Sequence, residues 1–413
     1  MGWTWKRGRD RAHALRAFAL GLLAGVLQAC STSMGPAPAP TAELATPPST
    51  TPARPTTKIA LLLPLGGMGE TAAIAKSMKQ GAEMALFEAN DPYVQLITKD
   101  DGGATAGART AAEAAVKEGA EIILGPLFSQ SVAGAAPVAR AANVPIVAFS
   151  NDAQVAGKGV YLMSFLADEE VNRVVGFAAS QGKKRFAALV PDNAYGNVAE
   201  GAFRRAVERV GGTVAIIERY PPAANGMLGP AKRVVETIKR NDEEMTPVDA
   251  LFLPGGQDAL PQIGPVIAYA GLDTRKVKLL GTGAWDFPSL GRDEAFVGGW
   301  YPSPDPAAWH SFAERFGKAF GSTPPRIASV TYDAVSMAIS LGANPPGARF
   351  TATELMRPNG FSGVDGIIRF NEKGLSEHAL AVLEVQKFSS AVVDPAPGSF
   401  QPRKLSAVER SVH

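Results

Sequence analysis

Residues 121–153 read EIILGPLFSQSVAGAAPVARAANVPIVAFSNDA, and the prediction of the fold starts from this stretch. The apolar run at 121–125 predicts a short strand covered on both faces, and 145–150 predicts another. The alanine-rich residues between the two runs are typical of a helix. Strands joined through a helix lie parallel when they share a sheet. The stretch therefore predicts a strand–helix–strand unit of an α/β protein.

The same alternation continues on both sides of this unit. Strands are also expected at 59–65, 94–99, 185–190, 213–219, 248–253 and 277–281, and helices at 169–180, 196–210, 229–240 and 260–269. The pattern restarts after Phe165, and a chain of 413 residues is long enough for two packed units. We therefore expect two doubly wound, Rossmann-like α/β lobes with mostly parallel sheets.

The last third of the chain breaks this rhythm. Helical patterns at 307–320 and 327–341 are followed by apolar runs at 366–370 and 380–388, which are expected to be closing strands. Periodicity is lost beyond Ser389, so an irregular tail is expected at 391–413.

The N-terminus has the features of an export signal. Five basic residues precede an apolar run at 17–27, which is too short to span a bilayer but suits a signal peptide. The following LQAC sequence ends at Cys30 and resembles the bacterial lipobox. We expect residues 1–29 to be a lipoprotein signal peptide and Cys30 to carry a membrane anchor, with Ser31 favouring the outer membrane. The alternative is an ordinary signal peptide that happens to contain a cysteine.

The segment after the signal lacks the composition of a folded region. Residues 30–57 are rich in Pro, Ala and Thr and have almost no large apolar side chain, so they are expected to form a flexible tether. The formal net charge is +2, and part of the basic excess belongs to the signal. A folded part so close to neutral gives no electrostatic case for binding nucleic acid.

Motifs typical of enzymes are scarce. The four histidines lack metal-ligand spacing, the single cysteine excludes a cysteine-rich zinc site, and no G-x-S-x-G or P-loop occurs. No catalytic site, metal or cofactor is therefore expected. One alternative is a nucleotide-cofactor-dependent enzyme, because GMGETA at 67–72 fits a dinucleotide-binding turn and Asp100 and Asp101 follow the next strand. A plain glycine-rich turn explains the same residues, and export favours that interpretation.

Small polar and aromatic residues follow the ends of the expected strands, where open α/β sheets bind ligands. The candidate ligand-binding residues are Ser129, Ser131, Ser150, Asn151, Tyr195, Trp285 and Asp286. Ser129 or Ser131 can place a helix N-terminus against a ligand carboxylate, or can cap that helix with no ligand present. Trp285 can instead be a hinge or core residue.

Four stretches resemble the type I periplasmic binding proteins, and specifically their leucine/isoleucine/valine-binding branch. They are KIALLLPLGG at 58–67, the stretch at 121–153, RFAALVPDNAYGNVAEGAFRRAVERVGGTV at 185–214 and FSGVDGIIRFNEKG at 361–374. The resemblance extends from about Lys58 to Phe388. It implies a protein that is not an enzyme and that traps a small polar or amino-acid-like ligand between two lobes.

The resemblance also implies how the chain is divided. Three hinge crossings are expected, near Phe165, near 287–298 and near 350–362. The first lobe would then comprise 58–165 and be completed by 298–349, while the second would comprise 166–297 and be completed by 350–390. Residues 307–341 would pack with the first lobe and 366–388 with the second.

In that family a serine after the third strand and small residues after the fourth hold the ligand carboxylate, which here implies Ser129 and Ser150-Asn151. A tyrosine of the second lobe covers the ligand, which implies Tyr195. An acid after the last strand of the second lobe meets the amino group, and Asp286 is the acid available there. The implied function is that of the substrate-binding protein of an ABC-type amino acid transporter, with an ABC permease as partner.

A second function remains open. The lipobox, the tether and GTGAWD at 281–286 together resemble the penicillin-binding protein activators. These are outer-membrane lipoproteins whose partner is a peptidoglycan synthase. A shared fold and a shared anchor do not separate the two functions, because the site determines function.

Overall fold

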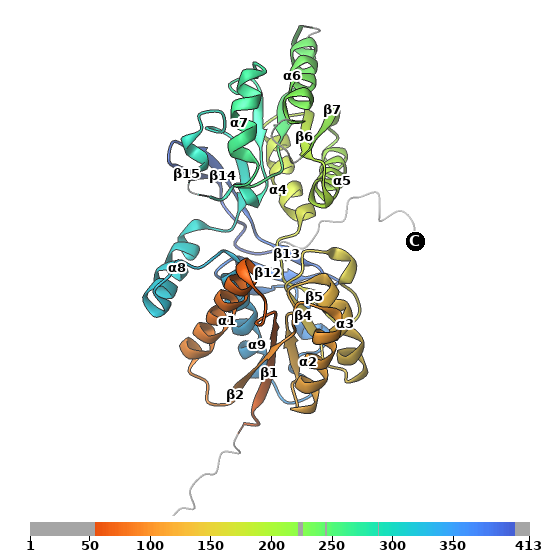
Figure 1. The fold of residues 1–413 in the computed structure, drawn as a ribbon, viewed down its shortest axis with the longest axis vertical. Helices are drawn as coiled ribbons and strands as arrows, with labels where there is room; N and C mark the ends of the chain where they lie inside the picture. The colour runs from red at the N-terminus through yellow and green to blue at the C-terminus, as the bar shows by residue number, and fades with distance from the viewer. Residues whose placement is uncertain (1–53, 222–225, 244–245, 288, 401–413) are drawn as a thin grey trace, which may run out of the picture. The chain divides into compact units, whose positions relative to one another are not determined.

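The structure, a computed structural model, describes residues 54–221, 226–243, 246–287 and 289–400. Within these residues the strands form a five-stranded, a seven-stranded and a three-stranded sheet (Figure 1). The expected signal peptide, Cys30 and most of the expected tether lie outside the described residues. No helix in the described ranges is both long and apolar enough to span a bilayer.

The first sheet has the strand order β2-β1-β3-β4-β5, and all neighbouring strands run parallel. Its strands are β1 (Thr57–Leu63), β2 (Val94–Asp100), β3 (Ile122–Leu124), β4 (Ile146–Ala148) and β5 (Val160–Leu162). Its helices are α1 (Gly69–Ala89), α2 (Thr105–Lys117), α3 (Ser129–Ala141) and α9 (Ile327–Gly342). We call this sheet and its helices the first lobe.

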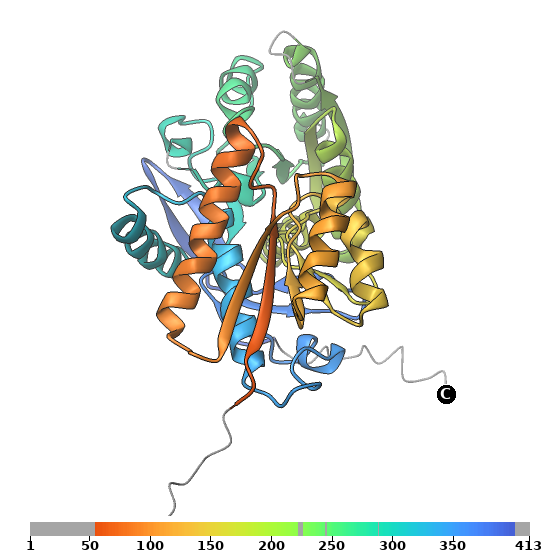
Figure 2. The same ribbon diagram turned by 60° about the horizontal axis from the view of Figure 1, so that its bottom comes forward.

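Helices cover both faces of the first sheet because alternate residues of its strands point to opposite sides. Leu61 packs in a cluster with residues of α1 and α9, while Leu62 packs with residues of α2 and α3. Helices α1 and α9 lie side by side in both ribbon views, although they come from opposite ends of the chain (Figures 1 and 2). The apolar run that predicted β1 is therefore buried on both faces.

The second sheet has the order β15-β14-β10-β9-β8-β6-β7. Its strands are β6 (Arg185–Pro191), β7 (Thr213–Tyr220), β8 (Ala250–Phe252), β9 (Lys278–Leu280), β10 (Trp300–Ser303), β14 (Ala381–Gln386) and β15 (Ser389–Asp394). Its helices are α4 (Ala167–Ser180), α5 (Ala194–Arg209), α6 (Leu228–Glu243) and α7 (Leu260–Tyr269). Strands β6 to β10 pair in parallel, whereas β14 and β15 are added antiparallel. This second lobe confirms the expected doubly wound α/β fold.

The three-stranded sheet corrects the expected division of the chain. It contains β11 (Phe361–Gly363), β12 (Gly366–Phe370) and β13 (Ser376–His378), all antiparallel. Phe361, Ile368 and Phe370 pack in the same buried cluster as Leu61 of the first lobe. Residues 366–370 thus belong with the first lobe, not with the second as the sequence analysis expected. The apolar pattern of β12 predicts a strand but does not show which core buries it.

The crossings between the lobes shift accordingly. The first lies between β5 and α4, close to Phe165. The second follows β10, later than expected, because Trp300 pairs with both Leu280 of β9 and Glu384 of β14. The third lies between β13 and β14, which is also later than expected. Helices α8 (Pro306–Phe320) and α9 then pack against α1, so 307–341 join the first lobe.

The folded part extends further in both directions than the sequence suggested. The folded part already includes Arg54, whose Nη1 lies 3.0 Å from Oδ2 of Asp91. At the other end, residues from Ser389 form strand β15 instead of an irregular tail. β15 is an edge strand with mostly exposed side chains, so it carries little of the apolar alternation that predicts strands.

Candidate functional site

Four of the expected site residues lie where strands of the first lobe end. Ser129 and Ser131 occupy the first turn of α3, directly after β3, and Ser150 and Asn151 follow β4. Ser131 is fully buried, and its Oγ has no hydrogen-bond partner. Ser150 is buried and accepts the N–H of Asp152 at 3.2 Å. Asn151 is exposed.

The N-terminus of α3 is not capped by a side chain. Phe128 is the N-cap residue, and neither Ser129 nor Ser131 makes a capping hydrogen bond. The first N–H groups of a helix have no partner within the helix and carry a partial positive charge. Neither serine therefore caps α3, and the first N–H groups of the helix remain available to an acceptor.

A cavity of about 250 Å³ opens at the same edge of the first lobe. Its polar lining residues are Asn151, Ser164 and Arg326, and the others are apolar: Phe149, Met163, Phe165, Ile327 and Val330. The sequence analysis missed Arg326. It directly precedes α9, far along the chain from the strand ends that were searched.

In the second lobe, Tyr195 presents a ring beside the end of β9. Its hydroxyl lies 2.9 Å from Oγ1 of Thr282, and 36% of the residue is exposed. Asn193 caps α5 by accepting the N–H of Gly196, which fixes the turn that carries Tyr195. Burial of the hydroxyl end, followed by the negative charge of Glu170, raises the pKa of Tyr195 above its usual value. The phenol is therefore neutral and can act as a hydrogen-bond donor.

Glu170, which the sequence analysis missed, lies beside this tyrosine. It belongs to the first turn of α4 and accepts the backbone N–H of Gly283, the residue after Thr282. A Cβ at Gly283 would lie 2.4 Å from Oε1 of Glu170, so only glycine admits the carboxylate at this point. Burial raises the pKa of Glu170 to about 7. In the sequence, Glu170 ends an Asp-Glu-Glu run that is typical of any helix N-terminus.

Trp285 lies in the core of the second lobe, which removes it from the candidate site. The residue is 1% exposed, and its Nε1 donates to the carbonyl of Leu253 at 3.0 Å. Its ring packs edge-on against Phe296, with centroids 5.3 Å apart. The interpretation of Trp285 as a core residue accounts for these contacts.

Asp286 lies in a network between the lobes. Its Oδ2 accepts from Oγ of Ser303 at 3.1 Å, its Oδ1 accepts from the hydroxyl of Tyr301 at 3.5 Å, and Nη2 of Arg326 lies 3.7 Å from Oδ2. The carboxylate thus already has two donors and a nearby cation. It is held at the second crossing and is poorly placed to serve as the partner of a ligand ammonium.

The same arginine approaches two buried acids of the first lobe. Nη1 of Arg326 lies 3.7 Å from Oδ1 of Asp365, whose Oδ2 accepts from Oγ of Ser329 at 2.7 Å. Asp333 accepts the N–H groups of Val364 and Asp365. Burial raises the pKa values of both Asp333 and Asp365, and the nearby charge of Asp365 raises that of Asp333 further. Arg326 therefore links this acid pair to Asp286 across the second crossing.

Asp100 and Asp101, the two acids of the dinucleotide-binding alternative, make hydrogen bonds within their own turn. Asp100 accepts the N–H of Gly102 at 2.9 Å, and Asp101 accepts the N–H of Gly103 at 2.8 Å. Asp101 is fully buried. These bonds support the interpretation of the glycine-rich segments as structural turns. In the described ranges, no group of three or more His, Cys, Asp or Glu side chains is placed to hold a metal ion.

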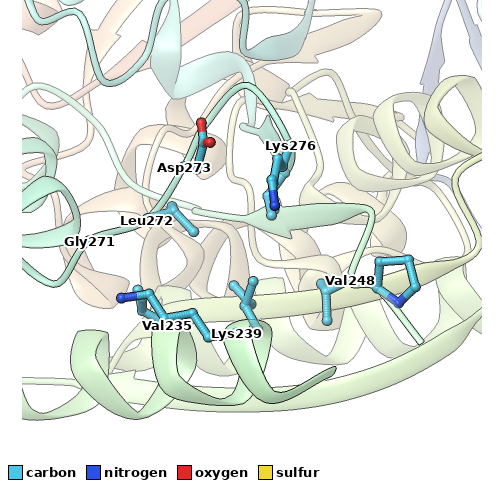
Figure 3. A pocket seen from close by; sticks show the side chains of 10 residues that line it. Val235, Lys239, Val248, Gly271, Leu272, Asp273 and Lys276 are labelled. Atoms are coloured by element: carbon cyan, nitrogen blue, oxygen red, sulfur yellow. The ribbon is translucent and has the colours of Figure 1, made fainter. Parts of the chain in front are cut away.

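A further cavity of about 180 Å³ lies in the second lobe, away from these groups (Figure 3). Val235 and Lys239 of α6 line one side, and Leu272 and Asp273, which follow α7, line another. Val248 precedes β8, so the cavity adjoins the amino ends of the strands. It is separate from the edge at which the candidate ligand groups gather.

Comparison with known proteins connects the fold to a family. A family model described as "Periplasmic binding protein" matches residues 56–390. A curated relative, the Leu/Ile/Val-binding protein homolog 6 of Brucella melitensis biotype 1, is 27% identical over 240 residues, which cover 54% of this chain and 59% of the relative. The match thus spans less than two thirds of that relative's length.

Solved structures share the fold. The substrate-binding protein of an ABC transporter from Desulfitobacterium hafniense, in complex with Leu, has a TM-score of 0.61 and 18% identity, covering 82% of this chain and 100% of that one. A solute-binding protein from Rhodopseudomonas palustris BisB5, in complex with 3,4-dihydroxybenzoic acid, has a TM-score of 0.55 and 20% identity, covering 83% and 99%.

The family match accounts for the two-lobed α/β fold, the helix-covered parallel sheets and the exchange of chain between lobes. It also accounts for the scarcity of enzyme motifs, because the family consists of solute-binding proteins of the periplasm. The chain belongs to the periplasmic binding protein family.

Proposed function

We propose that the protein captures an amino acid or a similar small carboxylate in the periplasm and delivers it to an ABC permease. The observation that carries the proposal is the uncapped N-terminus of α3 beside Ser129 and the buried hydroxyl of Ser131, which has no partner. A helix N-terminus with free N–H groups stabilises a carboxylate. Ser150 and Asn151, after the neighbouring strand, would complete this anion-binding wall.

The remaining groups suit the rest of such a ligand. Phe149, Met163 and Val330 offer apolar surface in the cavity at the same edge of the first lobe. Tyr195 would cover the ligand from the second lobe, with its hydroxyl fixed by Thr282. Binding proteins of two lobes close around their ligands by hinge motion. The two ligands in the similar solved structures, Leu and 3,4-dihydroxybenzoic acid, both carry a carboxylate.

Isothermal titration calorimetry of the purified protein should test this proposal. The panel would contain the twenty common amino acids and simple carboxylic acids that lack an amino group. At least one carboxylate should bind, and Ser129→Ala together with Ser131→Ala should weaken it by about 5- to 30-fold, because two hydroxyl contacts are lost. Absence of heat with every member would contradict a solute-binding role. It would favour the alternative of a lipoprotein that regulates a peptidoglycan synthase by contact.

We also propose that Cys30 carries the lipid that tethers the protein to a membrane, with the outer membrane favoured. The support is the basic N-terminal region, the short apolar run and the LQAC sequence. Cys30→Ser should move the protein from the membrane fraction to the soluble periplasmic fraction, as judged by cell fractionation and immunoblotting. Should the wild-type protein and the variant both fractionate as soluble, the anchor would be ruled out.

A further inference from the structure

We propose that the second lobe holds a second binding site, for a small apolar monocarboxylate that carries a single six-membered ring or a group of similar size. The site is the cavity of about 180 Å³ between α6 and the segment that joins α7 to β9 (Figure 3). It adjoins the amino ends of β8 and β9, whereas the groups of the proposed solute site follow the carboxyl ends of strands. The two sites are therefore separate, and this one does not rest on the proposed function.

The interior of the cavity is apolar. Its apolar lining residues are Val235, Ile238, Pro247, Val248, Leu272 and Val277. The three valines and Ile238 are each at most 7% exposed, so the cavity reaches into the core of the second lobe. An apolar cavity of about 150 Å³ in a protein core stays dry and can take up benzene. A cavity of about 180 Å³ therefore has room for one six-membered ring.

The loop after α7 leaves this space unfilled. Gly271 lines the cavity with a φ of 85°, a conformation that favours glycine, so the loop has no side chain at this point. A Cβ at Gly271 would also lie 2.9 Å from Nζ of Lys239. Protein interiors are otherwise packed as closely as organic crystals. The empty cavity lacks the dispersion contacts of such packing, and a bound ring would restore them.

The charged residues that line the cavity favour an anion. They are Lys239, Lys276 and Asp273, and both lysines are exposed to solvent. Nζ of Lys239 donates to the carbonyl of Ala270 at 3.4 Å, which uses one of its three donors. Asp273 accepts two hydrogen bonds from the guanidinium of Arg275, at 3.0 and 3.1 Å, and its carboxylate points away from the apolar residues (Figure 3). Two ammonium groups thus outnumber one carboxylate that is already paired.

A ligand of the proposed class would meet both parts of the site. Its ring would fill the apolar interior, and its carboxylate would accept a charge-assisted hydrogen bond from Lys239. An α-amino acid is a poorer ligand here, because its ammonium would lie beside two lysines. The acyl chain of a membrane lipid is too long for a cavity of this volume. The site therefore differs in selectivity from the proposed amino acid site.

Three ligands with one carbon skeleton test this class. 3-Phenylpropanoate carries a ring and a carboxylate, L-phenylalanine adds an ammonium, and 3-phenylpropan-1-ol has no charge. Isothermal titration calorimetry of the purified protein should give a Kd of about 0.1–1 mM for 3-phenylpropanoate, because ring burial and one charge-assisted contact both contribute. The alcohol should bind about 3- to 10-fold more weakly, because it lacks the charge. L-Phenylalanine should bind this site more weakly still.

Variants locate the binding within the molecule. Val248→Phe places a ring in the cavity and should weaken 3-phenylpropanoate by at least about 10-fold, while any heat with L-phenylalanine persists. Lys239→Gln keeps the interior and removes one ammonium, so it should weaken 3-phenylpropanoate by about 3- to 10-fold and leave the alcohol unchanged. Lys232→Gln makes the same change earlier on α6, at a side chain that lies over the ring of Tyr269 and does not line the cavity. It should leave both affinities unchanged.

The urea midpoint of each variant shows whether it remains folded. 3-Phenylpropanoate affinity that survives both Val248→Phe and Lys239→Gln would overturn the second site, and should Val248→Phe fail to fold, unchanged affinity in Lys239→Gln would overturn it alone. An affinity that falls with Ser129→Ala and Ser131→Ala would also overturn it, because the ligand would then occupy the first-lobe site. Absence of heat with 3-phenylpropanoate would rule out the second site and leave the proposed function intact, because amino acids test that function separately.

Discussion

Trp285→Ala should lower the free energy of unfolding by about 3–5 kcal/mol, because it removes the largest buried side chain of the second lobe and leaves a cavity. The indole fits closely against the backbone of neighbouring strands. A Cβ at Gly281 would lie 2.1 Å from the ring, and one at Gly299 would lie 2.7 Å from it. The substitution also leaves the carbonyl of Leu253 without its donor. Urea unfolding followed by circular dichroism would measure the change.

Two comparison variants test whether the loss of stability comes from the buried ring and its hydrogen bond. Trp285→Phe keeps most of the ring volume but cannot donate to Leu253, so its effect should be intermediate. Tyr269→Ala removes an aromatic ring that is 74% exposed on α7 and should have little effect. Equal unfolding midpoints for Trp285→Ala and the wild-type protein would show that Trp285 is not part of the core, and would return it to the candidate site.

Arg349→Ala should cost about 2–4 kcal/mol, the second largest effect that we expect. This side chain is only 2% exposed. Its Nη1 donates to Oε1 of Glu121 at 2.7 Å, its Nη2 donates to the carbonyl of Pro55 at 2.8 Å, and its Nε donates to the carbonyl of Asn344 at 3.0 Å. One guanidinium thus joins the start of the folded chain, the strand region before β3 and the end of α9.

The stability that Arg349 contributes should depend on the geometry of its guanidinium as well as on its charge. Arg349→Lys keeps the charge, but one ammonium cannot reach three acceptors that a planar fork serves at once, so it should recover only part of the stability. Arg275→Ala breaks an exposed pair with Asp273 and should leave the urea midpoint unchanged. A midpoint for Arg349→Ala that matches the wild-type value would contradict the assigned role.

Elements with a strong local pattern could be predicted from the sequence. The helix at Leu260–Tyr269 has the bounds that apolar spacing predicted, and β6 differs by a single residue. Strand β5 was missed, although β3, β4, β8 and β9 have the same length and were predicted. Strand β10 was missed because it has four residues and contains Pro302, which argues against a strand. A strand as short as β10 that also contains a proline has no local pattern that predicts it.

Fewer residues of the candidate site could be predicted from the sequence. The positions after β3 and β4 follow from topology, so Ser129 and Ser150 could be named in advance. Glu170 and Arg326 could not, because both begin helices whose strand neighbours come from other parts of the chain. Trp285 was ambiguous for a different reason: a large aromatic residue after a strand suits either a ligand or a core. Burial, which decides between these, is a property of the folded molecule.

The exchange of chain between the lobes also determines when each lobe can be completed during synthesis and export. The open edge of β10 is covered only when Ala381–Gln386 arrives, and the face of the first sheet that α1 covers is completed only by Ile327–Gly342. Neither lobe is therefore a contiguous segment that can finish folding while the rest of the chain is still being threaded across the membrane. A chain stopped before residue 381 would present the unpaired edge of β10 to its neighbours.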